Sequence, residues 1–307
     1  TSAINLINRF KILFLANRYH PNLTINFELD YDFGQGLFAL IFTILLSKFR
    51  TMTNLGLVLS GGGARGAAHI GVLKALEEHG ISPTHVSGTS VGAIVGALYA
   101  AGVHWSEILK FFKTVSIFTT KRFAFNKPGF LDTEKFYDDL KVFFPRDNFD
   151  ALEKSLFITA TNVISGNLKI FSKGQLIKPV IASASFPGVF TPTEINGSYY
   201  IDGGILNNFP VEPLKQHCDT IIGVYINSLQ KISIKDLNHS YNVADRALKI
   251  RAVSDSIRKF PECDFVIAPK DVGGFAIFGM SNTDAIFEMG YSEAMTALKE
   301  NENLFKN

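Results

Sequence analysis

The stretch Gly88-Thr89-Ser90-Val91-Gly92 has the Gly-x-Ser-x-Gly pattern of a serine on a sharp turn between a strand and a helix. Residues 84–87 before it resemble a short strand, and residues 91–101 after it are small and apolar, as in a buried helix. Glycines at both ends remove Cβ atoms that would clash, and the helix start favours an oxyanion. The motif indicates a nucleophilic serine. Because short matches arise by chance, an ordinary serine in a glycine-rich turn is the alternative.

A second strand–turn–helix unit precedes this serine. Residues 55–60 form a short apolar run, typical of a central parallel strand, and Gly61-Gly62-Gly63-Ala64-Arg65-Gly66 follows directly. A helix is expected next, because apolar side chains recur at three-residue steps until Gly80 and Pro83 end the pattern. The glycine loop therefore lies between the carboxyl end of a strand and the amino end of a helix, where anions bind.

The glycine loop has two interpretations. Gly61, Gly63 and Gly66 satisfy Gly-x-Gly-x-x-Gly, which makes a dinucleotide-binding oxidoreductase an alternative function. The acid that should bind the ribose is expected at the end of a second strand, whereas Glu77 and Glu78 lie on the same helix as the loop. In the other interpretation the loop is an oxyanion hole of backbone N–H groups. The serine motif that follows so soon favours the oxyanion hole.

An Asp-Gly-Gly sequence follows a predicted hairpin further along the chain. Residues 195–201 contain an Asn-Gly turn, and they lead into Asp202-Gly203-Gly204. Such a sequence is ordinary in turns, but an aspartate there could also take the proton from Ser90. A Ser-His-Asp triad, completed by His217 or His239 as in an α/β-hydrolase esterase, is a further alternative.

The remaining chain alternates between helix and strand signals from residue 55 onward. This alternation predicts one α/β domain with a mainly parallel central sheet flanked by helices. Further helices are expected at residues 105–112, 131–144 (with Asp132 as its cap), 177–185, 241–258 and 283–298, and further strands at residues 156–163, 168–171, 220–227 and 265–268.

Composition limits the function classes and the location. A net charge of only +2 gives no reason to expect a nucleic-acid partner. Cys218 and Cys263 are the two cysteines, too few for a disulfide framework, so a reducing compartment is expected. The predicted location is the cytoplasm, with membrane association as the alternative.

Two segments stand apart from this pattern. Residues 1–51 are expected to be an N-terminal extension that is a leader, a non-native segment or a membrane-associating segment, with the enzyme domain at 52–307. The apolar run at residues 36–46 is about half the length of a membrane-spanning helix. Residues 115–130 are basic and aromatic, which indicates a surface loop or, alternatively, a lid that touches a lipid surface.

The three motifs, in this order, resemble the patatin-like phospholipases of the bacterial type. The resemblance also includes residues 182–190, Ala-Ser-Ala-Ser-Phe-Pro-Gly-Val-Phe, and runs from about residue 55 to residue 211. The first 51 residues have no counterpart in the pattern, and roughly the last 90 match it only loosely. Three ordered motifs are far more specific than any one of them.

The resemblance implies a patatin-like three-layer architecture and a Ser–Asp dyad without histidine. Ser90 would be the nucleophile, and Asp202 the base that accepts its proton. The resemblance assigns the remaining site residues as follows: oxyanion hole, Gly61, Gly62, Gly63 and Ala64; support of the loop or of a substrate anion, Arg65 and Gly66; elbow, Gly88 and Gly92.

A serine acyl hydrolase that cleaves carboxylic ester bonds of phospholipids or lysophospholipids is therefore expected. The resemblance implies a lipid ester substrate and no metal or nucleotide cofactor, and we expect peripheral contact with membranes. The oligomeric state is left open. A catalytically weak lipid-binding protein on the same fold is the third alternative.

Overall fold

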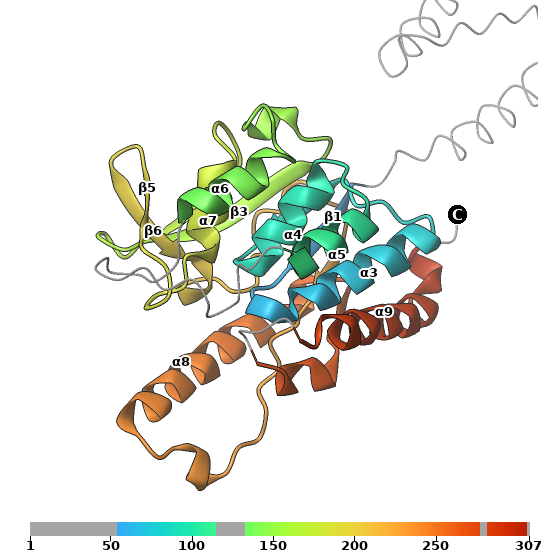
Figure 1. The fold of residues 1–307 in the computed structure, drawn as a ribbon. Coiled ribbons are helices and arrows are strands. Elements are labelled where there is room, and N and C mark those ends of the chain that lie inside the picture. Colours follow the sequence, from blue (N-terminus) through green and yellow to red (C-terminus); the bar gives the residue numbers. More distant parts are fainter. Residues whose placement is uncertain (1–53, 115–132, 277–280, 306–307) are drawn as a thin grey trace, which may run out of the picture. The chain divides into compact units, whose positions relative to one another are not determined.

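The structure, a computed structural model, describes residues 54–114, 133–276 and 281–305 (Figure 1). All of these residues lie in one compact unit, Thr53–Asn307. The predictions for residues 1–51, for residues 115–130 and for Asp132 as a helix cap lie outside the described residues.

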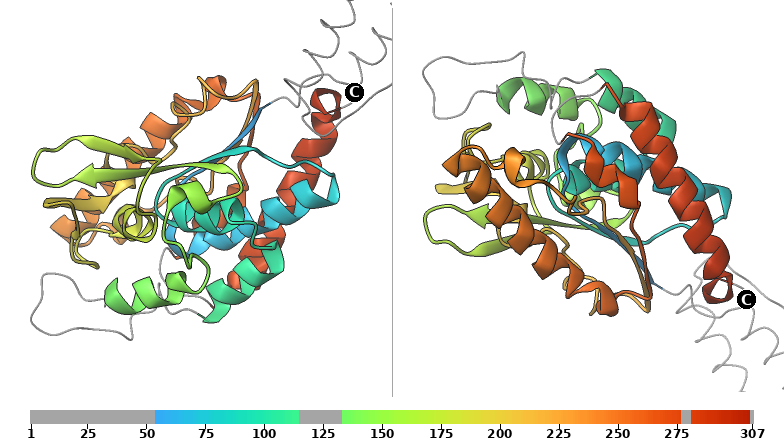
Figure 2. Two further views of the ribbon diagram at one scale, coloured as in Figure 1. Left: turned by 90° about the horizontal axis from the view of Figure 1, so that it is seen from above. Right: turned by 90° about the horizontal axis from the view of Figure 1, so that it is seen from below.

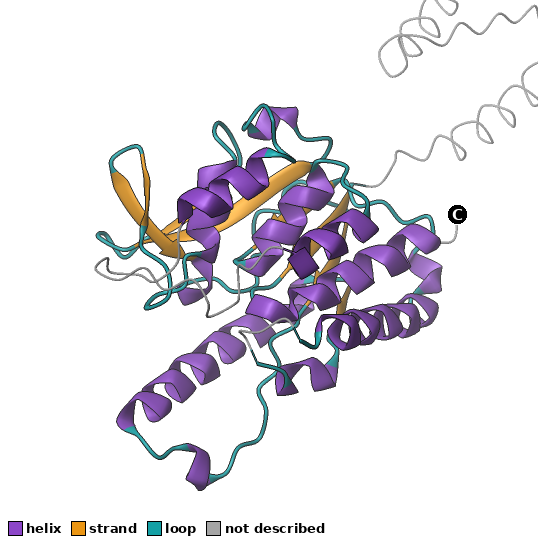
Figure 3. Cartoon of the chain, in the orientation of Figure 1, coloured by secondary structure: helices purple, strands orange, loops and turns teal. Residues whose placement is uncertain are grey.

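The described residues form an eight-stranded mixed sheet that is mostly parallel (Figure 3). The strand order is β5-β6-β3-β2-β1-β7-β8, and β4 pairs with β3 off this path. The run from β3 to β8 is parallel, whereas β4, β5 and β6 pair in antiparallel fashion. The strands are β1 (Leu55–Leu59), β2 (His85–Gly88), β3 (Ser155–Asn162), β4 (Leu168–Phe171), β5 (Thr193–Ile195), β6 (Ser198–Asp202), β7 (Thr220–Val224) and β8 (Phe265–Ile267). The predicted parallel core is confirmed.

The helices also begin and end close to their predicted limits. They are α3 (Ala67–Glu78), α4 (Val91–Ala100), α5 (Trp105–Thr114), α6 (Thr133–Lys141), α7 (Ile177–Ala184), α8 (Ser240–Ile257) and α9 (Thr283–Glu300). Two short 3-10 helices, η1 (Gly63–Gly66) and η3 (Gly203–Ile205), follow β1 and β6. In the described part of the chain, no helix combines the length and apolar composition needed to cross a membrane.

The sheet is covered on both faces, as side chains of β1 demonstrate. Leu57 and Leu59 join the larger hydrophobic cluster, to which α3, α4 and α9 contribute. Val58, which points to the opposite face, packs in a smaller cluster with Phe209 and Tyr225. Helix α9 packs along α3 on the outside of the larger cluster (Figure 2). The result is three layers, as predicted.

The register of β3 brings the two predicted catalytic segments together. Gly88, the last residue of β2, pairs with Ile158, and Asp202, the last residue of β6, pairs with Ala160. β4 pairs with both Ile158 and Ala160. Because a strand has only two edges, β4 occupies one of them, and β2 and β6 share the other. The ends of β2 and β6 therefore meet at neighbouring positions along β3.

Candidate active site

Ser90 lies in the turn between β2 and α4, where the sequence motif predicts it. Its backbone angles, φ 55° and ψ −123°, are rare for a residue with a side chain. Backbone strain of this kind typically costs about 1–3 kcal/mol and persists only where the surroundings hold it. One such contact comes from α7, since the Ser90 N–H donates to Ser183 Oγ at 2.8 Å.

The two elbow glycines are required by close backbone contacts. A Cβ on Gly88 would lie 2.4 Å from the carbonyl oxygen of Gly92. A Cβ on Gly92 would lie 2.2 Å from the carbonyl oxygen of Leu59 on β1. Only glycine fits at either position without moving the backbone, so the turn packs directly against the central strand.

Asp202, at the end of β6, is only 4% exposed and hydrogen-bonds to the Ser90 side chain. The Gly204 N–H donates to its Oδ1 at 2.7 Å. Burial raises the pKa of Asp202 to about 6, although the hydrogen bonds from Ser90 and Gly204 lower it and so limit the rise. At neutral pH the carboxylate is mostly ionised yet basic enough to take a proton from a hydroxyl.

The end of α7 holds both of these residues by their backbones. While Ser183 Oγ accepts from the Ser90 N–H, the Ser185 carbonyl oxygen accepts from the Asp202 N–H at 2.9 Å. Both serines are fully buried. Sequence reasoning missed their function, although they lie in the small-residue stretch 182–190 that contributes to the family resemblance.

Gly61 lies beside Ser90, but its N–H group is already paired. A Cβ on Gly61 would lie 3.3 Å from Ser90 Cβ and 2.3 Å from Asn208 Oδ1. Its N–H donates to the carbonyl oxygen of Asn208 at 3.2 Å. The Gly61 N–H, which is predicted to serve an oxyanion hole, therefore has a competing acceptor, and its place in that hole stays a prediction.

The N–H groups of Gly62, Gly63 and Ala64 lie at the amino end of η1. The first N–H groups of a helix have no acceptor within it, so these three can bind an anion. Gly66 allows this loop to pack against the start of α4, because a Cβ at this position would lie only 2.1 Å from Val91 Cγ2. The glycine loop and the serine turn are thus packed against each other.

Arg65 fastens the glycine loop to the last third of the chain. Its buried guanidinium donates from Nε to Phe275 O at 2.9 Å, from Nη1 to Asn227 Oδ1 at 3.0 Å and from Nη2 to Gly273 O at 3.0 Å. Burial lowers the pKa of this guanidinium. Of the two predicted roles for Arg65, these contacts support holding the loop.

Asn208 adds a buried donor close to Gly61 and Gly204. Its Oδ1 lies close to Gly61 and to Gly204, where a Cβ would be 2.8 Å away. Its Nδ2 is buried without a hydrogen-bond partner among the described residues. This amide could donate to a bound oxygen, because a buried unpaired donor gains free energy from an acceptor.

Among the described histidines, His69, His85 and His217 have partners other than Ser90 and Asp202. His69 is fully buried, with Nε2 donating to Ser60 O at 2.8 Å, and burial lowers its pKa to about 4, so it is neutral. His217 stacks on His85 with ring centroids 5.7 Å apart. The hydrogen bonds that act on the Asp202 carboxylate come from Ser90 and Gly204, not from a histidine of the described residues. The triad alternative is not supported.

The dinucleotide alternative gains no support either. Glu77 lies on α3 with its carboxylate 3.0 Å from His104, and Glu78 on the same helix accepts from Tyr291 Oη at 2.7 Å. β2, the next strand, contains no acid. Within residues 54–114, 133–276 and 281–305, no cluster of three or more His, Cys, Asp or Glu side chains could hold a metal ion.

Several known proteins are similar to this chain in sequence. A family model described as patatin-like phospholipase matches residues 57–215. Lysophospholipase NTE1 of Candida glabrata is 35% identical over 191 residues, which cover 60% of this chain and 11% of that protein. An uncharacterized NTE family protein of Mycobacterium tuberculosis is 32% identical over 186 residues, which cover 59% of this chain and 51% of that protein.

Among solved structures, VipD from Legionella pneumophila has a similar fold. The TM-score is 0.53 at 17% identity, and the match covers 81% of this chain and 67% of that chain. The chain spans about half the length of the mycobacterial relative and about a tenth of the yeast one.

Proposed function

Because the chain belongs to the patatin-like phospholipase family, we propose that it is a serine acyl hydrolase that cleaves carboxylic esters of lipids. The observation that carries this proposal is the hydrogen bond between Ser90, on its strained turn, and the buried carboxylate of Asp202. A serine hydroxyl is a weak nucleophile unless a base lies beside it, and Asp202 is that base.

In the acylation step, Ser90 Oγ attacks the ester carbonyl carbon while its proton passes to Asp202. The negative charge that develops on the carbonyl oxygen is bound by the N–H groups of Gly62, Gly63 and Ala64 at the start of η1. When the tetrahedral intermediate collapses, the bond to the alcohol breaks and the proton moves from Asp202 to the leaving oxygen. The acyl group remains on Ser90.

In the deacylation step, water attacks the acyl-enzyme and gives a proton to Asp202. The same three N–H groups bind the second oxyanion, and its collapse releases the carboxylic acid and returns the proton to Ser90. Asp202 thus performs both proton transfers without a histidine. Its pKa of about 6 suits this function, since the group must both accept and return a proton near neutral pH.

The substrates we propose are phospholipids or lysophospholipids, met at a lipid surface by peripheral contact. The name of the yeast relative, a lysophospholipase, makes lysophospholipid the first ester to test. We further propose that residues 52–307 form the hydrolase domain.

The test is fatty-acid release by the full chain from a panel of a diacyl phospholipid, a lysophospholipid and a p-nitrophenyl acyl ester. We expect release from at least one lipid ester, abolished in Ser90→Ala and Asp202→Asn and nearly unchanged in His239→Ala. Absence of release from every ester, or release that persists in Ser90→Ala, would overturn the proposal. A large loss in His239→Ala would favour a triad.

A further inference from the structure

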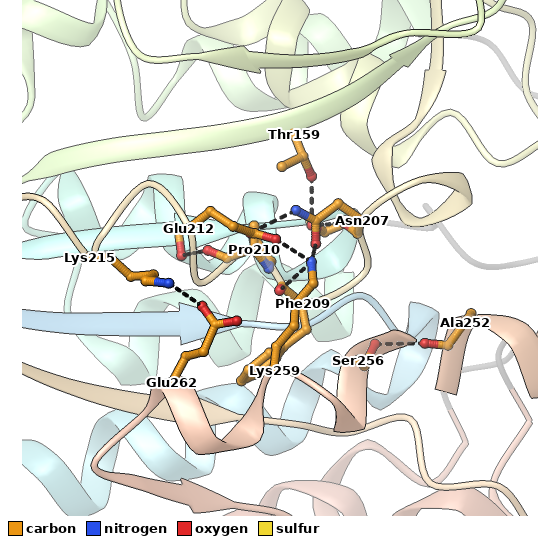
Figure 4. Close-up of polar contacts among 12 residues, drawn as sticks. Thr159, Asn207, Phe209, Pro210, Glu212, Lys215, Ala252, Ser256, Lys259 and Glu262 are labelled. Atoms are coloured by element: carbon orange, nitrogen blue, oxygen red, sulfur yellow. Dashed lines mark hydrogen bonds and ion pairs between the residues drawn. The ribbon is translucent and has the colours of Figure 1, made fainter. Parts of the chain in front are cut away.

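Three side chains form a closed polar cluster next to the proposed site (Figure 4). Lys259 Nζ donates to Asn207 Oδ1 at 2.7 Å and lies 2.5 Å from Glu212 Oε1. Asn207 Nδ2 donates to Glu212 Oε2 at 2.9 Å, which completes the ring. Lys259 Nζ also donates to Phe209 O at 3.4 Å. We call Asn207, Glu212 and Lys259 the Lys259 cluster.

The backbone of Asn207 connects this cluster to both halves of the proposed dyad. Its carbonyl oxygen accepts from Thr89 Oγ1 at 2.8 Å, and Thr89 immediately precedes Ser90. Its N–H donates to Gly203 O at 2.8 Å, and Gly203 immediately follows Asp202. Asn207 therefore hydrogen-bonds to the chain neighbour of Ser90, the proposed nucleophile, and to the chain neighbour of Asp202, the proposed base.

Two of the three side chains in the cluster are largely buried. Asn207 is 4% exposed and the Lys259 side chain is 20% exposed, whereas the Glu212 side chain is 45% exposed. Burial raises the pKa of Glu212, and the hydrogen bonds from Lys259 and Asn207 lower it. The hydrogen bonds have the larger effect, so the pKa is lowered overall and Glu212 stays ionised at neutral pH. Breaking the ring would leave the buried Asn207 amide without a partner for its oxygen.

Lys259 reaches this loop from a distant part of the chain. It follows the end of α8, 52 residues after Asn207, and lies outside the family match at residues 57–215. Within that match, Thr89 and Gly203 bind the backbone of Asn207 and Glu212 accepts from its Nδ2, whereas Lys259 binds its Oδ1 from outside the match.

We propose that Lys259 is a positioning residue, which holds Asn207 and thereby keeps the turns of Ser90 and Asp202 in register for proton transfer. The proposal rests on the proposed hydrolase function. Misplacing reacting groups by about 1 Å can reduce a rate about 10²-fold. Loss of the Lys259 anchor should therefore act on the chemical step and not on substrate binding.

A second ion pair in the same region provides the matched control (Figure 4). Lys215 Nζ lies 2.9 Å from Glu262 Oε2, and the two side chains are 52% and 32% exposed. This pair joins the same two parts of the chain but does not contact Asn207. Comparison of the two lysines separates a positioning function from a general contribution of surface charge to stability.

The experiment measures kcat and KM for the lipid ester, together with Tm, in the full chain and in Lys259→Met, Lys259→Arg and Lys215→Met. We expect Lys259→Met to lower kcat about 10- to 100-fold with KM changed less than about twofold. Lys259→Arg, which keeps the charge and several donors, should retain at least about fivefold more kcat than Lys259→Met. Lys215→Met should stay within about twofold of the wild type.

Equal kcat in Lys259→Met and Lys215→Met would overturn the inference, as would a rise in KM with kcat unchanged or equal kcat in the Met and Arg variants. Glu212→Gln opens the ring, because its single amide oxygen can accept from Lys259 or from Asn207 Nδ2 but not from both, and it gives a second comparison if Lys259→Met does not fold. We expect it to lower kcat about two- to fivefold, and an unchanged kcat would contradict the inference. A wild type without ester hydrolysis would contradict the proposed function itself, which distinguishes the two failures.

Discussion

Two aspartates in tight turns of this chain have pKa values shifted in opposite directions. Asp202 is buried, hydrogen-bonds to Ser90 and Gly204, and has a pKa raised to about 6. Asp147, at φ 43°, has a lowered pKa, because four donors outweigh the effect of burial. Those donors are Tyr137 Oη at 2.8 Å, Gln175 Nε2 at 3.0 Å, Leu176 N–H at 3.2 Å and Ile177 N–H at 2.7 Å.

The number of donors distinguishes Asp202, the proposed base, from Asp147. Each donor stabilises the ionised carboxylate and weakens its affinity for a proton. Asp147 is saturated with donors and joins α6 to the start of α7, so it is an anion that holds structure. Asp202 has few donors, and one of them is the hydroxyl whose proton it would take.

The largest difference between the Asp202→Asn and Asp147→Asn variants is expected in their rate of ester hydrolysis. Asp202→Asn should lower kcat for ester hydrolysis about 10²- to 10⁴-fold, because the amide cannot accept the Ser90 proton. Asp147→Asn should leave kcat within about twofold at a temperature where both variants are folded. The measurement is fatty-acid release under saturating substrate. A comparable loss of kcat in both variants would remove the distinction.

A smaller effect is expected in the pH dependence of the wild type. Hydrolysis requires the ionised form of Asp202, so the rate should rise with pH through about 6. Between pH 7 and pH 5 the ionised fraction falls about tenfold, and kcat/KM should fall in proportion. Asp147→Asn should show the same profile. A midpoint near the ordinary pKa of an aspartate would show that Asp202 is not the base that limits the rate.

The weakest effect concerns stability, and its sign differs between the two sites. The folded state binds the Asp202 proton more tightly than the unfolded chain does. Ionisation of Asp202 therefore lowers the free energy of unfolding as pH rises from about 4 to about 6. At pH 7, Asp202→Asn should therefore raise the free energy of unfolding, by at most about 3 kcal/mol. This gain should fade below about pH 4, where the cost is absent.

Asp147→Asn should do the reverse, since its carboxylate contributes stability at neutral pH that is lost as pH falls through its lowered pKa. Loss of charged hydrogen bonds should destabilise the protein by about 2 kcal/mol. Thermal unfolding at pH 7 and pH 4 measures both effects. A destabilised Asp202→Asn together with a stabilised Asp147→Asn at pH 7 would show that donors do not explain the difference.

The sequence alone predicts the elements that carry Ser90 and Asp202, the proposed dyad. The strand before Gly61, the turn at Ser90 and the hairpin before Asp202 each depend on local signals, namely an apolar run, paired glycines and an Asn-Gly turn. The structure has each of them within a few residues of the predicted limits. The resemblance to a family then connected the three motifs, and the structure brings Ser90 and Asp202 into hydrogen-bond contact.

The supporting contacts could not be predicted in the same way, because they join residues far apart in the chain. Arg65 bonds to carbonyl oxygens more than 200 residues later, and Lys259 bonds to Asn207 across 52 residues. Neither pairing has a periodicity or a turn signature. The pairing of the Gly61 N–H also depends on a distant residue, Asn208, that no local pattern indicates.

The activation of Ser90 by Asp202 can be measured as the rate at which a lipid-like fluorophosphonate labels the serine. The reagent needs an activated serine, and intact-mass analysis with peptide mapping identifies the labelled residue. We expect one label on Ser90 in the wild type and in Asp147→Asn, none in Ser90→Ala, and labelling at least about 10²-fold slower in Asp202→Asn. Labelling of Ser90 at an undiminished rate in Asp202→Asn, or no labelling of the wild type, would contradict the claim that Asp202 activates Ser90.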